Sequence, residues 1–204
     1  AYGSPTEKLE AIAKFASRQS VTKLMARWEV FQRQLNVNGS IVEVGVHRGA
    51  SLMAWAQFSS ILEPVNYLRK IIGFDTFSGF PSIDEKDQAG DSEHLKVGGF
   101  AAGGESKHEL ERAIELYDVN RLMNHIPKCE LVEGDASETI PAYLEANPHL
   151  VVSLLHLDAD LYEPTRISLQ HLVPRIPKGA IVVFDELNLK LLPGETMAPQ
   201  EVLG

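Results

Sequence analysis

Residues 151–160 read Val-Val-Ser-Leu-Leu-His-Leu-Asp-Ala-Asp, an apolar run that ends in two aspartates. Similar short runs rich in β-branched residues occur at 41–44, 71–74, 131–132 and 180–184. Between them lie stretches with helical spacing of apolar residues, at 51–62, 107–116, 139–146 and 161–172. Strands that alternate with helices are typical of a parallel sheet with right-handed crossovers. The sequence therefore predicts a doubly wound, mostly parallel α/β domain.

Two segments lie outside this alternation. Residues 1–38 carry apolar side chains at helical spacing until Asn38-Gly39 ends the pattern, which predicts two N-terminal helices before an α/β domain at 39–204. Residues 82–106 contain five glycines and many acidic side chains but little apolar periodicity. A loop of this length inside a compact domain is usually functional, so we expect a lid here.

Composition excludes several classes of protein. Among 204 residues, 19 Lys and Arg stand against 28 Asp and Glu, a net charge of −9 without a basic cluster. Nucleic acid and anionic membrane surfaces are therefore not expected partners. Cys129 is the single cysteine, which rules out an intrachain disulfide and a thiolate metal cluster. No apolar stretch approaches the ~20 residues that cross a bilayer, and no secretion signal is recognisable, so we expect a cytoplasmic protein and, in addition, a homo-oligomer.

The residues that follow each apolar run carry the chemistry, because ligands of open parallel sheets bind beyond the carboxyl ends of the strands. The first run ends in Glu-Val-Gly-Val-His-Arg-Gly at 43–49, which fits a cofactor loop and a plain turn equally well. Asp75 ends the second run, where an acid can accept hydrogen bonds from ribose hydroxyls or cap a turn. Asp135 follows the third run and has the spacing of a capping box with Glu138, so a place beside an adenine ring is a second interpretation.

The last two runs end in a concentration of acids. Asp160 and Glu163 have the spacing of a capping box, which leaves Asp158 without a structural role. The fifth run ends in Asp185 and Glu186. If the two strands are neighbours, about 4.8 Å apart, Asp158, Asp185 and Glu186 converge. Three close carboxylates repel one another unless a hard cation such as Mg²⁺ neutralises them; the alternative is a set of solvated acids at loop starts.

Other catalytic signatures are missing from the sequence. There is no Gly-x-Ser-x-Gly elbow and no phosphate-binding Gly-x-x-x-x-Gly-Lys-Ser/Thr loop. The histidines lack paired metal spacing, and we expect His156 to be a packed core residue. A nicotinamide-dependent dehydrogenase would also use a glycine turn and a ribose-binding acid, but it normally has glycine where His47 stands and needs no carboxylate triad. A non-catalytic cofactor-binding domain is the third alternative.

Four motifs, at 42–49, 73–81, 156–165 and 193–196, together resemble the macrocin O-methyltransferase family. Its members are S-adenosylmethionine-dependent and metal-dependent enzymes that methylate sugar hydroxyls on natural products. The resemblance extends from about residue 39 to the C-terminus and implies the Rossmann-like fold of class I methyltransferases. That fold usually continues into a sixth and an antiparallel seventh strand, so we expect a sheet that either lacks its last strands or is completed differently, because the sequence stops at Gly204.

The resemblance also implies roles for individual residues. It places Glu43, Gly45 and Gly49 at the methionine end of the cofactor, Asp75 at the ribose, and Asp135 beside the adenine. The complete implied cofactor set is Glu43, Gly45, His47, Gly49, Ser51, Asp75, Thr76, Asp135, Ala136, Ser137 and Asp158.

By the same resemblance, Asp158, Asp185 and Glu186 would hold Mg²⁺, which would bind two neighbouring hydroxyls of a small-molecule acceptor. Related enzymes often have Asp-Asp where this chain has Asp185-Glu186. The cation would lower the pKa of an acceptor hydroxyl, Asp158 or Asp160 would take the proton, and the alkoxide would attack the sulfonium methyl group. A sugar diol, a catechol-like diol or another hydroxylated metabolite would each suit such a site.

Overall fold

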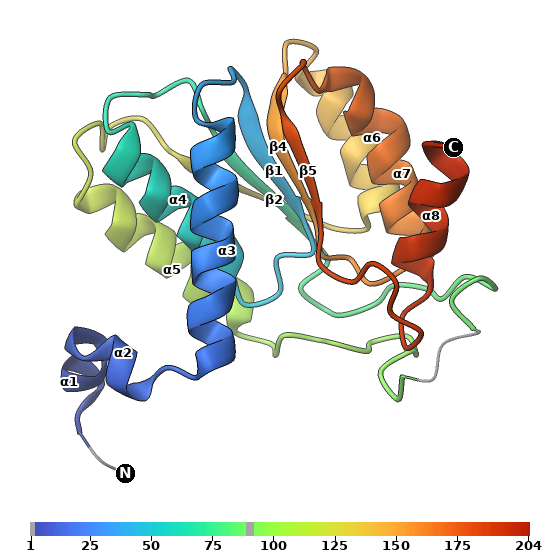
Figure 1. Cartoon of the computed structure of the whole chain (residues 1–204), viewed down its shortest axis with the longest axis horizontal. Helices are drawn as coiled ribbons and strands as arrows, with labels where there is room; N and C mark the ends of the chain where they lie inside the picture. The colour runs from blue at the N-terminus through green and yellow to red at the C-terminus, as the bar shows by residue number, and fades with distance from the viewer. Residues whose placement is uncertain (1–2, 89–91) are drawn as a thin grey trace.

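The computed structural model describes residues 3–88 and 92–204, and this part of the chain contains a five-stranded parallel sheet (Figure 1). The strand order is β3-β2-β1-β4-β5. The strands are β1 (Ser40–Val44), β2 (Ile71–Asp75), β3 (Cys129–Glu133), β4 (Val152–Leu157) and β5 (Ile181–Phe184). Every predicted apolar run is a strand, and β4 and β5 are neighbours, so the predicted fold is confirmed.

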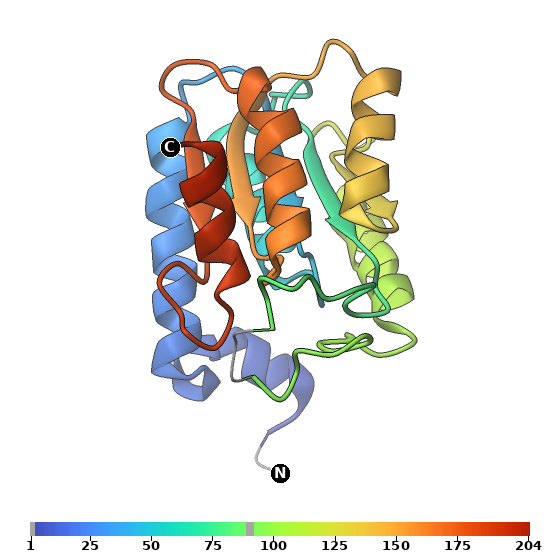
Figure 2. The same ribbon diagram turned by 90° about the vertical axis from the view of Figure 1, so that its right-hand side faces the viewer.

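Helices cover both faces of the sheet (Figures 1 and 2). One face carries α3 (Arg18–Gln34), α4 (Ala50–Leu62) and α5 (Ser106–Val119). The other face carries α6 (Ala136–Ala146), α7 (Tyr162–Leu172) and α8 (Gly194–Val202), with the short 3-10 helix η1 (Val173–Arg175) after α7. None of the described helices combines the length and the apolar character needed to span a bilayer.

The core consists of two layers of apolar side chains, one on each face of the sheet. Ile41 of β1 packs with Leu52 and Trp55 of α4 in the first layer. In the second layer, Val42, the next residue of β1, packs with Leu169 of α7. Successive strand residues point to opposite faces, so a strand that is buried on both sides must be apolar throughout. This explains why uninterrupted apolar runs, rather than alternating ones, mark the strands of this sequence.

The N-terminal segment forms three helices where the sequence predicted two. Ser4 caps α1 (Pro5–Glu10) in a capping box with Glu7, α2 (Ile12–Phe15) follows directly, and Ser17 caps α3. Helix α3 belongs to the packed core, because Phe31 is fully buried in the first layer. In contrast, α1 and α2 contain no buried residue.

Two segments, α8 after β5 and residues 82–106 after β2, differ from the sequence-based predictions or add detail to them. Helix α8 was not predicted, since Pro193, Gly194 and Pro199 all disfavour a helical pattern, yet it packs along α7. The predicted lid at 82–106 is irregular up to α5, and its residues 89–91 lie outside the described residues. Backbone hydrogen bonds between residues 98–99 and Phe80 connect this segment to the chain that follows β2.

Candidate active site

A pocket of about 340 Å³ lies along the carboxyl ends of β1, β2, β4 and β5. Its wall combines backbone from the strand ends, acidic side chains and an apolar rim from the segment after β2. Of the residues expected at the site, the following line it: Gly45, His47, Asp75, Thr76, Asp135, Ala136, Asp158, Asp160, Asp185 and Glu186.

The carboxylate of Asp75 organises the part of the pocket next to β1 and β2. Its Oδ2 accepts hydrogen bonds from the amides of Val46 and His47, both at 2.7 Å, and its Oδ1 accepts one from Phe77 at 2.6 Å. His47 and Phe77 adopt left-handed φ angles of 52° and 54°, which are unfavourable for these side chains. A carboxylate has about four lone-pair positions, so one on Oδ1 is left for a ligand. Asp75 is thus a turn-forming acid that still faces the pocket.

Gly45 is required where β1 approaches the end of β4. Its φ is +90°, and an added Cβ would lie 1.8 Å from the carbonyl oxygen of Asp158. No side chain fits at that distance. Gly49 has φ +79° and begins α4 as its N-cap, where a Cβ would collide with the side chain of Leu110. The two glycines of the 43–49 motif are therefore required for different reasons: Gly45 for the close approach of two parallel strand ends, and Gly49 for the start of a helix.

Glu43 lies beneath the pocket rather than in its wall. The carboxylate is fully buried and accepts hydrogen bonds from Ser51 Oγ at 2.7 Å and Trp55 Nε1 at 2.8 Å, while His156 Nδ1 lies 3.2 Å from Oε2. Its oxygens are directed into the first core layer, towards α4. Glu43 and Ser51, together with Gly49 and Ser137, do not line the pocket that the described residues form.

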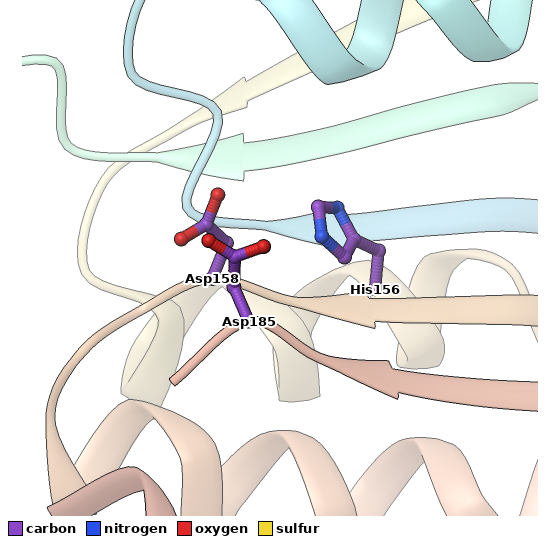
Figure 3. Close-up of side chains that lie close together, drawn as sticks. All are labelled: His156, Asp158 and Asp185. Carbon is purple, nitrogen blue, oxygen red and sulfur yellow. The ribbon is translucent and has the colours of Figure 1, made fainter. Parts of the chain in front are cut away.

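The ends of β4 and β5 bring Asp158 and Asp185 together, as expected from neighbouring strands (Figure 3). Leu157 pairs with Phe184, so the two aspartates follow at the same level of the sheet. One ligand atom each from His156, Asp158 and Asp185 lie within 4.8 Å of one another. Glu186 lines the same pocket but is not a member of this group, and the ammonium of Lys23 lies 3.2 Å from Asp185 Oδ2.

Burial and mutual repulsion shift the pKa values of these acids. Burial, and then the charge of Asp185, raises the pKa of Asp158 to about 6. Burial, and then Asp158 and Glu195, raises the pKa of Asp160 to about 8. Burial and Asp185 also raise the pKa of Glu186. These shifts mean that the fully ionised cluster is unfavourable by itself and that a bound cation would stabilise it.

The chemistry of the donors fits a hard divalent cation. Two carboxylates lie at the centre of the group, a third lines the same pocket, and oxygen donors are the ligands that Mg²⁺ prefers. His156 is 2% exposed and packs edge-on against Trp55, as expected for a core histidine. Burial lowers its pKa and the Glu43 carboxylate raises it, with a net increase.

The predicted capping box of Asp160 and Glu163 is wrong. Leu161 is the N-cap of α7, without a capping side chain, and Asp160 has a left-handed φ of 62°. The first amide of the helix, on Tyr162, instead donates to Asp87 Oδ1 at 2.9 Å. The cap comes from the long segment after β2, which no local spacing reveals.

At α6 the predicted cap forms, although Asp135 binds the amide of Ser137 and does not form the predicted capping box with Glu138. Asp135 is the N-cap and accepts the amide of Ser137 at 2.9 Å, while Asp135 and Ala136 also form pocket wall. This residue therefore combines a helix cap with a place in the pocket wall.

Sequence reasoning missed three residues that shape the site. Lys23 reaches Asp185 from α3, and Asp87, only 1% exposed, caps α7. Glu195, fully buried, accepts amides from the segments after β4 and β5. Glu195 stands in the 193–196 motif, but nothing in that motif shows what the side chain contacts.

Comparison with known proteins places this geometry among methyltransferases. Residues 16–195 match the model of the macrocin-O-methyltransferase (TylF) family. The chain is 28% identical over 153 residues to demethyldecarbamoylnovobiocin O-methyltransferase of Streptomyces niveus. The matched stretch covers 74% of this chain and 53% of that protein. It is 29% identical over 153 residues, with the same coverage, to a tetracenomycin-C 4'-O-methyltransferase of Streptomyces olivaceus that is named for a dimethoxy-rhamnosyl substrate. The chain thus spans about half the length of these curated relatives.

Solved structures are similar over nearly the whole chain. A crystal structure of the calicheamicin methyltransferase CalS11 has a TM-score of 0.93 and 38% identity, covering 98% of this chain and 78% of that one. An apo structure of CalS11, described as a TDP-rhamnose 3'-O-methyltransferase, has a TM-score of 0.83 and 34% identity, covering all of this chain and 80% of that one. The O-methyltransferase NovP, at 22% identity and a TM-score of 0.65, shares the fold over 88% of this chain and 69% of its own.

Proposed function

The chain belongs to the macrocin O-methyltransferase family, and we propose from this that it transfers a methyl group from S-adenosylmethionine to a sugar hydroxyl with the help of Mg²⁺. One observation carries the proposal beyond family membership. A single pocket contains a ribose-competent acid, Asp75, at the end of β2 and the paired acids Asp158 and Asp185 at the ends of β4 and β5.

The cofactor would extend along the first three strand ends. The remaining lone pair of Asp75 Oδ1 would accept a ribose hydroxyl, and Asp135 with Ala136 would lie beside the adenine. Gly45 and His47 would border the methionine end. S-adenosylmethionine supplies an electrophilic methyl group on a sulfonium sulfur.

Glu43 and Ser51 support this arrangement from below. Their hydrogen bond joins β1 to α4, so it fixes the loop that would contact the cofactor. We therefore assign them a supporting role in place of the direct contact that the resemblance implied.

Asp158, Asp185 and Glu186 would hold the cation. Mg²⁺ prefers oxygen to nitrogen donors, so Glu186, which lines the same pocket, is a better third ligand than His156. When bound, the cation polarises the acceptor hydroxyl and lowers its pKa.

The reaction needs a proton acceptor that is close to the cation but is not one of its ligands. Asp160 lines the pocket two residues beyond Asp158 and lies outside the ligand group, and a bound cation would lower its raised pKa, so its ionised carboxylate would take the proton of the acceptor hydroxyl; Asp158 is the alternative base. The oxygen–carbon bond to the methyl group forms as the carbon–sulfur bond breaks, and the electron pair remains on sulfur. Much of the rate enhancement would come from positioning.

The segment at 82–106 would close the acceptor side. Gly99 and Phe100 line the pocket, and the ring of Phe100 lies edge-on to Phe80, with 5.6 Å between centroids. An apolar rim of this kind excludes water from the reacting atoms.

A methyl-transfer assay tests the proposal. The protein is incubated with labelled S-adenosylmethionine and TDP-rhamnose, the sugar nucleotide named for the CalS11 relative. We expect one methyl group on the sugar with Mg²⁺ and none with EDTA, loss of transfer in Asp185→Asn, and normal transfer in Glu145→Gln, an exposed control on α6. Transfer that survives EDTA would exclude the cation. Failure with TDP-rhamnose and with other sugar diols, when catechols are methylated, would exclude the sugar.

A further inference from the structure

Glu195, at the start of α8, joins the two chain segments that carry Asp158 and Asp185. Its side chain is fully buried. Oε2 lies 3.2 Å from the amide nitrogen of Asp160, in the segment after β4, and Oε1 lies 3.1 Å from the amide nitrogen of Glu186, in the segment after β5. One carboxylate therefore connects two segments that have no covalent link near the site.

The next residue adds a third contact of the same kind. Thr196 Oγ1 accepts the amide of Asn188 at 2.7 Å. Asp160 and Asn188 both have left-handed φ angles, 62° and 63°, a conformation that is uncommon outside glycine and most frequent in Asn and Asp. The amides of both residues are bound by side chains of α8.

Gly194 explains how the helix start comes so close. An added Cβ would lie 1.8 Å from Asp87 Oδ1 and 2.4 Å from the amide nitrogen of Tyr162. The starts of α7 and α8 are therefore in contact, with the cap of α7 between them. We call residues 193–196 the clasp: glycine permits the approach, and glutamate and threonine provide the acceptors.

We propose that Glu195 is a positioning residue that sets the separation of the Asp158 and Asp185 carboxylates. Each of these aspartates is within two residues of an amide that Glu195 binds. Loss of the clasp would let the two segments move apart and would reduce cation affinity, although Glu195 itself need not touch the cation. The effect on the cation rests on the proposed function, whereas the restraint of the two segments does not.

Amide hydrogen exchange of the metal-free protein tests the restraint directly. Glu195→Asp keeps the charge but shortens the side chain by one methylene, so both hydrogen bonds are lost. We expect exchange at residues 160 and 186 to accelerate about tenfold or more, as for a lost hydrogen bond to a charged acceptor. Glu195→Gln keeps one acceptor oxygen, so exchange should accelerate at one of the two amides. Glu201→Gln, on the exposed end of α8, is the control.

Calorimetry with Mg²⁺ tests the consequence. We expect the Kd for Mg²⁺ to rise about tenfold in Glu195→Asp, while the Kd for S-adenosylhomocysteine changes less than about twofold. This difference is expected because Glu195 would position only the carboxylates of Asp158 and Asp185. Wild-type exchange and wild-type Mg²⁺ affinity in Glu195→Asp would overturn the proposal, because charge rather than geometry would then be sufficient. If the unaltered protein binds no Mg²⁺, the cation part of the proposed function fails, and the exchange rates alone decide whether the clasp restrains the two segments.

Discussion

Replacing Asp75 with alanine should weaken both the protein and its cofactor site, for reasons that can be separated. The side chain binds the amides of Val46, His47 and Phe77, and it leaves one lone pair towards the pocket. The first three contacts stabilise the fold, and the last would hold the ribose.

The expected loss of stability follows from these contacts. Three hydrogen bonds to a carboxylate, at about 1.5–3 kcal/mol each, amount to roughly 4.5–9 kcal/mol. Relaxation of the left-handed residues His47 and Phe77 returns about 1–3 kcal/mol each. The net decrease in the free energy of unfolding is therefore about 3 kcal/mol, which urea denaturation monitored by circular dichroism can measure.

The expected loss of affinity is independent of that decrease. One hydrogen bond between a ribose hydroxyl and a carboxylate is worth about 1.5–3 kcal/mol, or roughly a 10- to 100-fold change in Kd. Titration calorimetry with S-adenosylhomocysteine should show this change in Asp75→Ala at a temperature where the variant is folded.

A neighbouring acid provides the control. Glu133 pairs with Asp75 in the sheet register but is exposed and contacts Lys107, so Glu133→Gln should bind the cofactor normally. Wild-type affinity in Asp75→Ala would refute the assignment of the ribose to Asp75, whatever the change in stability.

Three further predictions concern the acids that follow β4 and β5 and the glycine that packs against them. Asp185→Asn should raise the Kd for Mg²⁺ at least about tenfold and leave S-adenosylhomocysteine binding unchanged by calorimetry, because one charged ligand is lost. Without metal, the free energy of unfolding should fall as the pH rises from 5 to 7, because folded Asp158, Asp160 and Glu195, with pKa values of about 6, 8 and 7, keep protons that the unfolded chain releases. Asp160 alone should contribute about 1.4 kcal/mol per pH unit, so Asp160→Asn should reduce the slope by about that amount in urea titrations; an unchanged slope would contradict the pKa assignment. Gly45→Ala should lower the melting temperature and cation affinity together, because its Cβ would displace the backbone of Asp158; retention of both would show that the strand ends can separate.

The sequence was sufficient for the sheet because its strands are buried on both faces. Ile41 and Val42 pack into different core layers, so burial on both sides produced the apolar run from which the strand was predicted. The pairing of Asp158 with Asp185 depended on the adjacency of β4 and β5, which the sequence reasoning took as a condition and the sheet register confirms.

Contacts between distant segments were not accessible in the same way. The cap of α7 by Asp87 joins residues that are 75 positions apart, so a local capping box at Asp160 was the wrong interpretation. Glu195 binds amides that lie 35 and 9 residues away in the sequence. Helix α8 was not predicted because its prolines are unfavourable for a helical pattern. Spacing rules describe neighbours in sequence, and these contacts exist only after the segments have packed.

The most direct test of the central claim is calorimetric titration of the protein with S-adenosylhomocysteine and with NAD, each in Mg²⁺ and in EDTA. We expect S-adenosylhomocysteine to bind and NAD not to bind, because His47 lines the pocket where a dinucleotide fold normally has glycine. Binding of NAD alone, or of neither compound, would contradict the assignment of this pocket to methyl transfer.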